Sequence, residues 1–189
     1  NQYRDYYCGD ITENEVGKTV KISGWVENIR DHGGVIFVDV RDAKGVIQVV
    51  SNDDSIFSDL TKESTVTITG TVRKRDEDDY NDHIKTGTIE ILVDTLELIS
   101  KSLPLPFDIK SSHIVNEETR LKYRYLDLRR PVLQKNLILR NRITLLVRNY
   151  LAKYGFTEVE TPILCRSTPE GARDYLVPSR ISKGQFYAL

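Results

Sequence analysis

An aromatic ring lies among polar side chains on one face of the strands predicted for the first half of the chain. Phe37 alternates with Ile36 and Val38, so its ring lies on the opposite side from the apolar row of its strand. Polar side chains interrupt or oppose the apolar rows of the other strands: Arg30, Gln48, Arg73, Arg75 and Glu90. If neighbouring strands are in register, these groups converge where they could stack an unpaired base and hydrogen-bond to base edges. A solvated face with one exposed Phe would give the same pattern.

A second concentration of chemistry lies in the middle of the chain. Within residues 120–130, five cations are interleaved with two tyrosines: Arg120, Lys122, Tyr123, Arg124, Tyr125, Arg129 and Arg130. Such a mixture suits contacts with phosphate and sugar. The solvent-exposed rim of a helix would look similar, and both interpretations stay open.

Cysteine usage argues against a disulfide framework and a zinc cluster. Cys8 and Cys165 are the two cysteines, far apart and outside any CxxC spacing, so we expect both to be packing residues. The sequence lacks a run of about 18 apolar residues, and its first 30 residues carry several charges. We therefore expect neither a membrane span nor a secretory signal, and a cytoplasmic setting.

Five short runs with alternating apolar residues predict strands at 19–28, 35–41, 46–50, 65–75 and 88–99. Turn-forming residues separate these runs, and residues 53–62 could form one short helix. Five strands with a helix between the third and fourth predict an all-β, five-stranded barrel of the oligonucleotide-binding (OB) type.

Charge divides the chain after Leu103. Residues 1–103 hold 12 Lys and Arg against 20 Asp and Glu, whereas residues 104–189 hold 15 against 8. An acidic barrel would repel nucleic acid as a diffuse field, so any RNA contact there must use a few placed residues. We predict a barrel domain at 1–103, a connector at 104–131 and a second domain at 132–189. Apolar spacing predicts a helix over 133–154, ended by Gly155, and then a strand over 156–164 that contains Pro162.

Three motifs resemble bacterial-type aspartyl-tRNA synthetases of class II. Residues 24–26 (GWV), 30–31 (RD) and 37–42 (FVDVRD) form the first, which asparaginyl and lysyl relatives share, and residues 122–130 (KYRYLDLRR) form the second. Residues 168–178 (TPEGARDYLVP) are the most specific match. Residues 155–164, with Pro162, are similar to motif 1 of class II, whose helix and strand form the homodimer interface. The resemblance implies that residues 132–189 begin an α+β catalytic domain.

The resemblance implies a two-step reaction assisted by magnesium. Aspartate attacks the α-phosphate of ATP to give aspartyl-adenylate, and the terminal ribose hydroxyl of tRNA then takes the aspartyl group. Because ATP-binding motifs 2 and 3 of the family have no counterpart here, we expect this chain to carry no catalytic residues or metal ligands and to be inactive alone as an N-terminal fragment. Glu170 would bind the α-ammonium of aspartate through a charge-assisted hydrogen bond.

In the same resemblance, the barrel binds the tRNA anticodon. Phe37 would stack on a base, and the implied base or backbone contacts are Arg30, Gln48, Arg75, Asn81 and Glu90. His32 lies in the turn where many relatives that also charge asparagine tRNA have His. The second marker of that group, a Gly, falls at Asp78, so the pattern is half met. His32 therefore permits relaxed tRNA specificity without enforcing it.

Two other function classes remain open from the sequence. The chain could be a non-catalytic tRNA-binding module, or a relative specific for asparagine or lysine. The motif at 168–178 favours the enzyme because a pure binding module has no use for a substrate loop.

Overall fold

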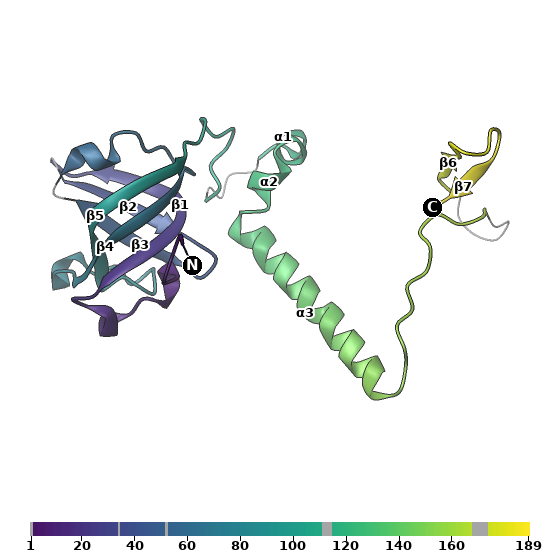
Figure 1. Cartoon of the computed structure of the whole chain (residues 1–189), viewed down its shortest axis with the longest axis horizontal. Helices are drawn as coiled ribbons and strands as arrows, with labels where there is room; N and C mark the ends of the chain where they lie inside the picture. The colour runs from purple at the N-terminus through teal and green to yellow at the C-terminus, as the bar shows by residue number, and fades with distance from the viewer. Residues whose placement is uncertain (1, 34, 52, 111–114, 168–173) are drawn as a thin grey trace. The chain divides into compact units, whose positions relative to one another are not determined.

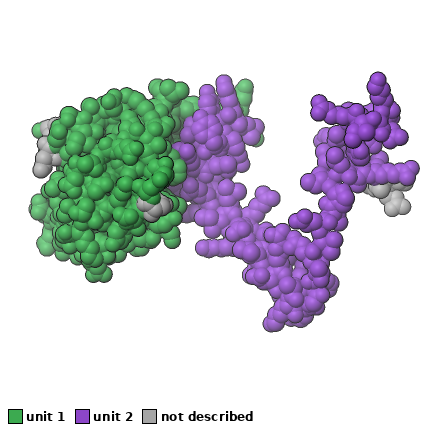
Figure 2. Space-filling view, in the orientation of Figure 1, with its two compact units in different colours: residues 1–119 green, residues 120–189 purple. Residues whose placement is uncertain are grey.

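The computed structural model describes residues 2–33, 35–51, 53–110, 115–167 and 174–189. The chain divides into two compact units, residues 1–119 and 120–189 (Figure 2). This boundary falls inside the predicted connector, 104–131. The first unit contains all the strands of the predicted barrel.

Five strands close into a barrel in the first unit (Figure 1). Their order around the barrel is β1, β2, β3, β5, β4, and β4 pairs with β1 to close it. Neighbouring strands are antiparallel except β3 and β5, which run parallel and share only two residue pairs. The OB-fold prediction is confirmed, with strand ends within three residues of the predicted ranges: β1 (Thr19–Asp31), β2 (Ile36–Arg41), β3 (Val46–Ser51), β4 (Thr65–Lys74) and β5 (Ile89–Ser100).

The barrel interior is built from the predicted apolar rows. In β2, Val38 and Val40 are fully buried, while Phe37 and Asp39 on the opposite parity are half-buried. Two strands approach each other closely at Gly70, where an added Cβ would lie 2.2 Å from the carbonyl oxygen of Leu92. A side chain at this position would push β4 away from β5, so glycine is required there.

A short 3-10 helix replaces the helix predicted over 53–62. One turn, η3 (Asp54–Phe57), forms there, and Asp53 caps it by accepting a hydrogen bond from the Ser55 amide at 3.0 Å. The longer prediction was wrong because the chain turns again to bury Leu60 before β4. Three further 3-10 turns lie around the barrel: η1 (Cys8–Asp10), η2 (Glu13–Glu15) and η4 (Glu77–Asp79).

Helices α1 (Glu117–Lys122) and α2 (Arg124–Asp127) precede a long helix, α3 (Pro131–Lys153). The last confirms the helix predicted over 133–154. Pro131 occupies the first turn, where its missing N–H breaks no hydrogen bond, and Gly155 follows with a left-handed φ of 83°. Many apolar side chains of α3 are exposed, including Leu146 and Tyr150. None of the described helices is long and apolar enough to cross a bilayer.

The strand predicted over 156–164 is wrong. This stretch is extended but unpaired, and an isolated bridge joins Cys165 to Ala188 immediately after it. A strand needs a neighbour to bond with, and no described segment pairs with 156–164. Pro162 therefore lies in exposed, irregular backbone. The described end of the chain forms a small hairpin, β6 (Leu176–Pro178) with β7 (Phe186–Ala188).

Candidate nucleic-acid interface

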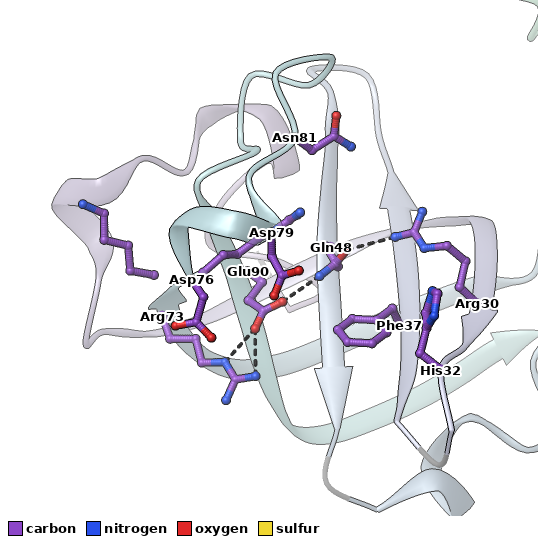
Figure 3. Close-up of a pocket in the computed structure, with 11 residues that line it drawn as sticks. Arg30, His32, Phe37, Gln48, Arg73, Asp76, Asp79, Asn81 and Glu90 are labelled. Carbon is purple, nitrogen blue, oxygen red and sulfur yellow. Dashed lines mark hydrogen bonds and ion pairs between the residues drawn. The ribbon is translucent and has the colours of Figure 1, made fainter.

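A cavity of about 650 Å³ opens on the side of the barrel (Figure 3). Side chains from all five strands and from the loop between β4 and β5 surround it. The predicted residues Arg30, Phe37, Gln48, Arg75, Asn81 and Glu90 all line this cavity, together with His32. Its remaining lining is Arg73, Lys74, Asp76 and Asp79. The structure thus brings together residues that are separated by up to 60 positions in the sequence.

A row of hydrogen-bonded polar side chains, which we call the polar belt, lies at this cavity and takes one residue from each strand. Strand register places these residues side by side, since Asp39 is the Cα partner of Gln48 and Arg73 is that of Glu90. In the order of the barrel strands, the belt consists of Arg30, Asp39, Gln48, Glu90 and Arg73.

Arg30 forms the first half of the polar belt. Its two terminal nitrogens donate to the two carboxylate oxygens of Asp39, each over 2.8 Å. Nη2 of Arg30 also donates to Oε1 of Gln48 at 2.9 Å. Bidentate pairs of this kind hold a guanidinium plane in one orientation.

Glu90 joins the second half of the belt. It accepts a hydrogen bond from Nε2 of Gln48 at 2.6 Å and one from Nε of Arg73 at 2.8 Å (Figure 3). Glu90 exposes only 6% of its surface and Gln48 only 8%. A buried carboxylate is costly unless it is paired and hydrogen-bonded, and both conditions are met here.

Arg75 is buried with part of its hydrogen-bonding capacity unused. Nε donates to the carbonyl oxygen of Ile89 at 3.0 Å, but the buried Nη2 has no hydrogen-bond partner among the described residues. Burial lowers the pKa of this guanidinium, against the opposing charges of Glu90 and Asp39. A buried donor that lines a cavity without a partner is suited to an incoming acceptor.

Phe37 and His32 form an aromatic corner of the cavity. Their ring centroids lie 5.8 Å apart at an interplanar angle of 72°, an edge-to-face contact. The tight turn at His32 is closed by its amide, which donates to the Val35 carbonyl at 3.0 Å, and Gly33 supplies the left-handed φ of 65°. The contact orients the Phe37 ring beside the polar belt.

The acidic loop between β4 and β5 forms the rim. Asp76, Asp79 and Asn81 line the cavity, whereas Asp78 is exposed and does not. The Oδ1 atom of Asn81 accepts a hydrogen bond from the His83 amide at 3.0 Å. The side-chain NH2 group of Asn81 therefore points away from the His83 amide. Of the two predicted specificity positions, the structure places His32 at the cavity and Asp78 outside it.

The second predicted group of cations is organised by one buried carboxylate. Asp127, whose side chain is fully buried, accepts from Nε of Arg120 at 3.1 Å and from Nη1 of Arg124 at 2.8 Å. Nη1 of Arg130 lies 3.6 Å away. Burial of Asp127 opposes ionisation, but these three guanidinium groups outweigh it and hold the pKa of the carboxyl below its usual range.

One predicted site residue has no structural account. Glu170, the expected contact to the aspartate ammonium, lies outside the described residues. Among the described residues, no cluster of three or more His, Cys, Asp or Glu side chains could hold a metal ion. The described residues therefore offer no such cluster for magnesium.

Sequence reasoning missed Asp39 as a member of the site. Its parity, shared with Phe37, placed it on the polar face, but an acidic residue on an acidic barrel gave no reason to single it out. The signal that could have found it is the register of β1 with β2, which sets this carboxylate one diagonal step from Arg30. Asp76 and Asp79, which the sequence did not single out, line the cavity as well.

Two protein families match this chain. Residues 20–99 match the family described as OB-fold nucleic acid binding domain. Residues 116–189 match the family described as tRNA synthetases class II (D, K and N). The first match spans the barrel strands, and the second spans the whole second unit, residues 120–189.

Curated relatives are similar over almost the whole chain. The aspartate–tRNA(Asp/Asn) ligase of Thermodesulfovibrio yellowstonii is 49% identical over 193 residues, an alignment that covers 99% of this chain and 32% of the relative. The protein of the same name from Halothermothrix orenii is 52% identical over 192 residues, covering 98% of this chain and 32% of the relative. The chain thus spans about a third of the length of these relatives.

Solved structures share the fold. The asparaginyl-tRNA synthetase of Pyrococcus horikoshii, complexed with asparaginyl-adenylate, superposes with a TM-score of 0.80 at 26% identity, covering 97% of this chain and 42% of that one. The aspartyl tRNA synthetase of Entamoeba histolytica gives a TM-score of 0.73 at 22% identity, covering 87% and 41%. At that identity the second likeness concerns the fold alone.

Proposed function

We propose that this chain, a homologue of aspartate–tRNA(Asp/Asn) ligases in both its barrel and its second unit, is part of a class II synthetase whose barrel binds the anticodon loop of tRNA. The observation that carries this proposal is the convergence in one cavity of a half-buried aromatic ring, oriented polar groups and a buried guanidinium nitrogen that has no partner among the described residues. Single-stranded RNA is recognised by stacking of splayed bases and by hydrogen bonds to their edges, and this cavity offers both.

In the proposed complex, Phe37 stacks on one unpaired base. Arg30 and Arg75 donate to base or backbone oxygens, Glu90 accepts from a base amino or imino group, and Gln48 can do both. Asn81 at the rim contacts a neighbouring nucleotide. Because the first half of the chain is acidic, these placed groups and not a diffuse positive field provide the affinity.

We also propose that the whole protein activates aspartate with ATP and magnesium and transfers it to tRNA. The carboxylate of aspartate would attack the α-phosphate, pyrophosphate would leave, and the ribose hydroxyl of tRNA would then displace AMP. In this reaction Glu170 holds the substrate ammonium, a cytoplasmic homodimer forms through the region around Pro162, and the ATP and metal contacts come from outside the described residues.

Relaxed tRNA specificity is a further part of the proposal. The similar relatives are named for both aspartate and asparagine tRNA, and His32 contacts Phe37 at the cavity. An imidazole can donate to or accept from either of two bases, whereas a branched apolar side chain only fills space. The expected result is charging of both tRNAs by the whole protein, and Asp78, being outside the cavity, should matter less than His32.

Titration of RNA hairpins into this chain tests the anticodon proposal. A hairpin with the aspartate anticodon GUC should bind more tightly than the same hairpin with a scrambled loop. Equal binding of both hairpins would overturn the proposal. Preferred binding of the lysine anticodon UUU would point instead to a lysyl relative, and preference for GUC without charging by the whole protein would indicate a non-catalytic tRNA-binding module.

A further inference from the structure

We propose that Asp39 is a positioning residue that makes the cavity select bases over RNA backbone. Its carboxylate holds the Arg30 guanidinium in one orientation and compensates its charge. Arg30 then acts as an oriented hydrogen-bond donor to bases and attracts phosphate less. The inference rests on the proposed binding of an anticodon loop. It assigns a role to a residue that would not itself touch the RNA, since Asp39 is absent from the cavity lining.

The contact between Asp39 and Arg30 has the geometry that such a role requires. Both carboxylate oxygens accept from Arg30 at 2.8 Å, and the Asp39 side chain exposes only 13% of its surface. The pair is therefore partly shielded from water, which strengthens it relative to an exposed ion pair. Arg30 keeps its third contact, the hydrogen bond to Gln48, in the plane that Asp39 sets.

The orientation of Gln48 follows from the same carboxylate. Its Oε1 accepts from Arg30 and its Nε2 donates to Glu90, so the two ends of the amide are distinguished by their neighbours. If Arg30 moved away, only the Glu90 carboxylate would hold the amide, and Oε1 of Gln48 would be left to accept from other donors at the cavity. Asp39 thus fixes the hydrogen-bonding pattern of two residues that face a base.

Charge compensation has a separate consequence. An unpaired guanidinium near RNA attracts phosphate and releases counterions, which makes binding depend on salt but not on sequence. Asp39 cancels the charge of Arg30, as Glu90 cancels that of Arg73 across the belt. Both arginines can still donate hydrogen bonds to bases, while their attraction for phosphate is reduced.

Two variants of the full chain separate position from charge. Asp39→Asn keeps the side-chain size but removes the compensating charge, and Asp39→Glu keeps the charge but displaces it by one methylene. Asp94→Asn is the matched control, because Asp94 is an exposed residue of β5 outside the cavity. Each variant is titrated with the GUC hairpin and with hairpins that carry one change at the first or second anticodon base, because the proposed relaxed specificity tolerates U in place of C at the third. The titrations are run at several salt concentrations, and the melting temperature of each variant is recorded.

We expect Asp39→Asn to lose about tenfold of the preference for GUC over the changed hairpins, in line with the discrimination carried by oriented base contacts. Its affinity should also become more salt-dependent, with a log–log slope steeper by about 0.7 for one extra phosphate contact. Asp39→Glu should lose preference without a change of slope. Asp94→Asn should match the unmodified chain in both measurements.

The inference is overturned if folded Asp39→Asn keeps both the preference and the slope of the control. If that variant does not fold, Asp39→Glu decides, and unchanged preference in it overturns the inference equally. A failure of the unmodified chain to prefer GUC over the scrambled loop is a different result, because it removes the proposed anticodon binding itself.

Discussion

Substitution of Phe37 tests whether its ring faces a ligand or helps to hold the barrel together. Its ring contacts His32 at the cavity, whereas Phe57 is buried in the core. Phe37→Ala should weaken binding of the GUC hairpin by roughly tenfold to a hundredfold, because base stacking on an aromatic ring is worth about 1 to 3 kcal/mol. Hairpin titration measures the affinity, and thermal melting measures the stability of the barrel.

Phe57→Ala is the matched control for this prediction. Removing a core phenyl ring should cost about 3 to 5 kcal/mol of stability. A similar loss in Phe37→Ala would show that its ring is structural.

Arg75 should matter for binding and little for stability. Its Nη2 is buried without a partner among the described residues, and burial already lowers the pKa of the guanidinium. Arg75→Met removes this unsatisfied donor and retains an unbranched apolar stem, so the melting temperature should hold or rise. Hairpin affinity should fall at least tenfold, as expected for a lost charge-assisted hydrogen bond. Lower stability with unchanged affinity would contradict this assignment.

The two cysteines should differ in reactivity. Cys8 is buried, and burial together with the charge of Asp42 raises the pKa of its thiol, whereas Cys165 is exposed. Because the thiolate is the reactive form, Ellman's reagent should titrate one thiol in the native chain and two in denaturant. Cys165→Ser should abolish the native signal. Rapid labelling of Cys8 in the native chain would show that the contact with Asp42 is not maintained.

At the scale of elements, the segment formed by α1 and α2 should depend on pH. The folded pKa of Asp127 is held below its unfolded value, so the carboxylate contributes stability at neutral pH that is lost as pH falls through the folded pKa. The opening free energy of this segment, obtained from hydrogen-exchange protection factors at Leu126 and Leu128, should therefore fall in acid. Asp127→Asn should be less stable at neutral pH and show a weaker pH dependence. An unchanged pH dependence would mean that another group controls it.

Strands were predictable from the sequence because one face of each is buried. Alternation located Ile22, Val38 and Ile91 in the core and Phe37 on the opposite face, since a shift by one residue would expose every apolar side chain. The prediction of a strand at 156–164 was wrong because alternating residues show only that a segment could pair with another strand. No described segment pairs with this one.

The residues of the candidate site were predictable only in part. Parity placed Arg30, Gln48 and Glu90 on a common face, but it could not show that they bond to one another, because register between strands is a tertiary property. Asp39 therefore escaped notice. The same limit applied to the acidic loop, where Asp76 and Asp79 line the cavity but Asp78 does not.

At the scale of the whole chain, the opposite charges of its two halves predict how binding depends on salt. Arg30 and Arg73 at the cavity are paired with carboxylates, and the first half of the chain carries more acids than bases. Few counterions should be released, so hairpin affinity should fall less than about tenfold between 50 and 200 mM salt, against a thousandfold or more for a protein with many phosphate contacts. Fluorescence titration over this range measures the slope. A steep loss of affinity with salt would indicate that the basic residues after 103 make the main RNA contacts.

The parallel junction of β3 and β5 has a consequence for motion. Only Val49–Ile91 and Val50–Leu92 pair across it, whereas β4 and β5 pair along most of their length. Sub-global opening of a closed barrel starts where the fewest backbone bonds must break, so the amides of this junction should exchange with solvent at a lower opening free energy than those of β4. The hydrogen bond from Gln48 to Glu90 crosses the same junction. A bound RNA that contacts both side chains would therefore stabilise the closed barrel. RNA binding could then be measured as slower hydrogen exchange of buried amides that do not contact the RNA.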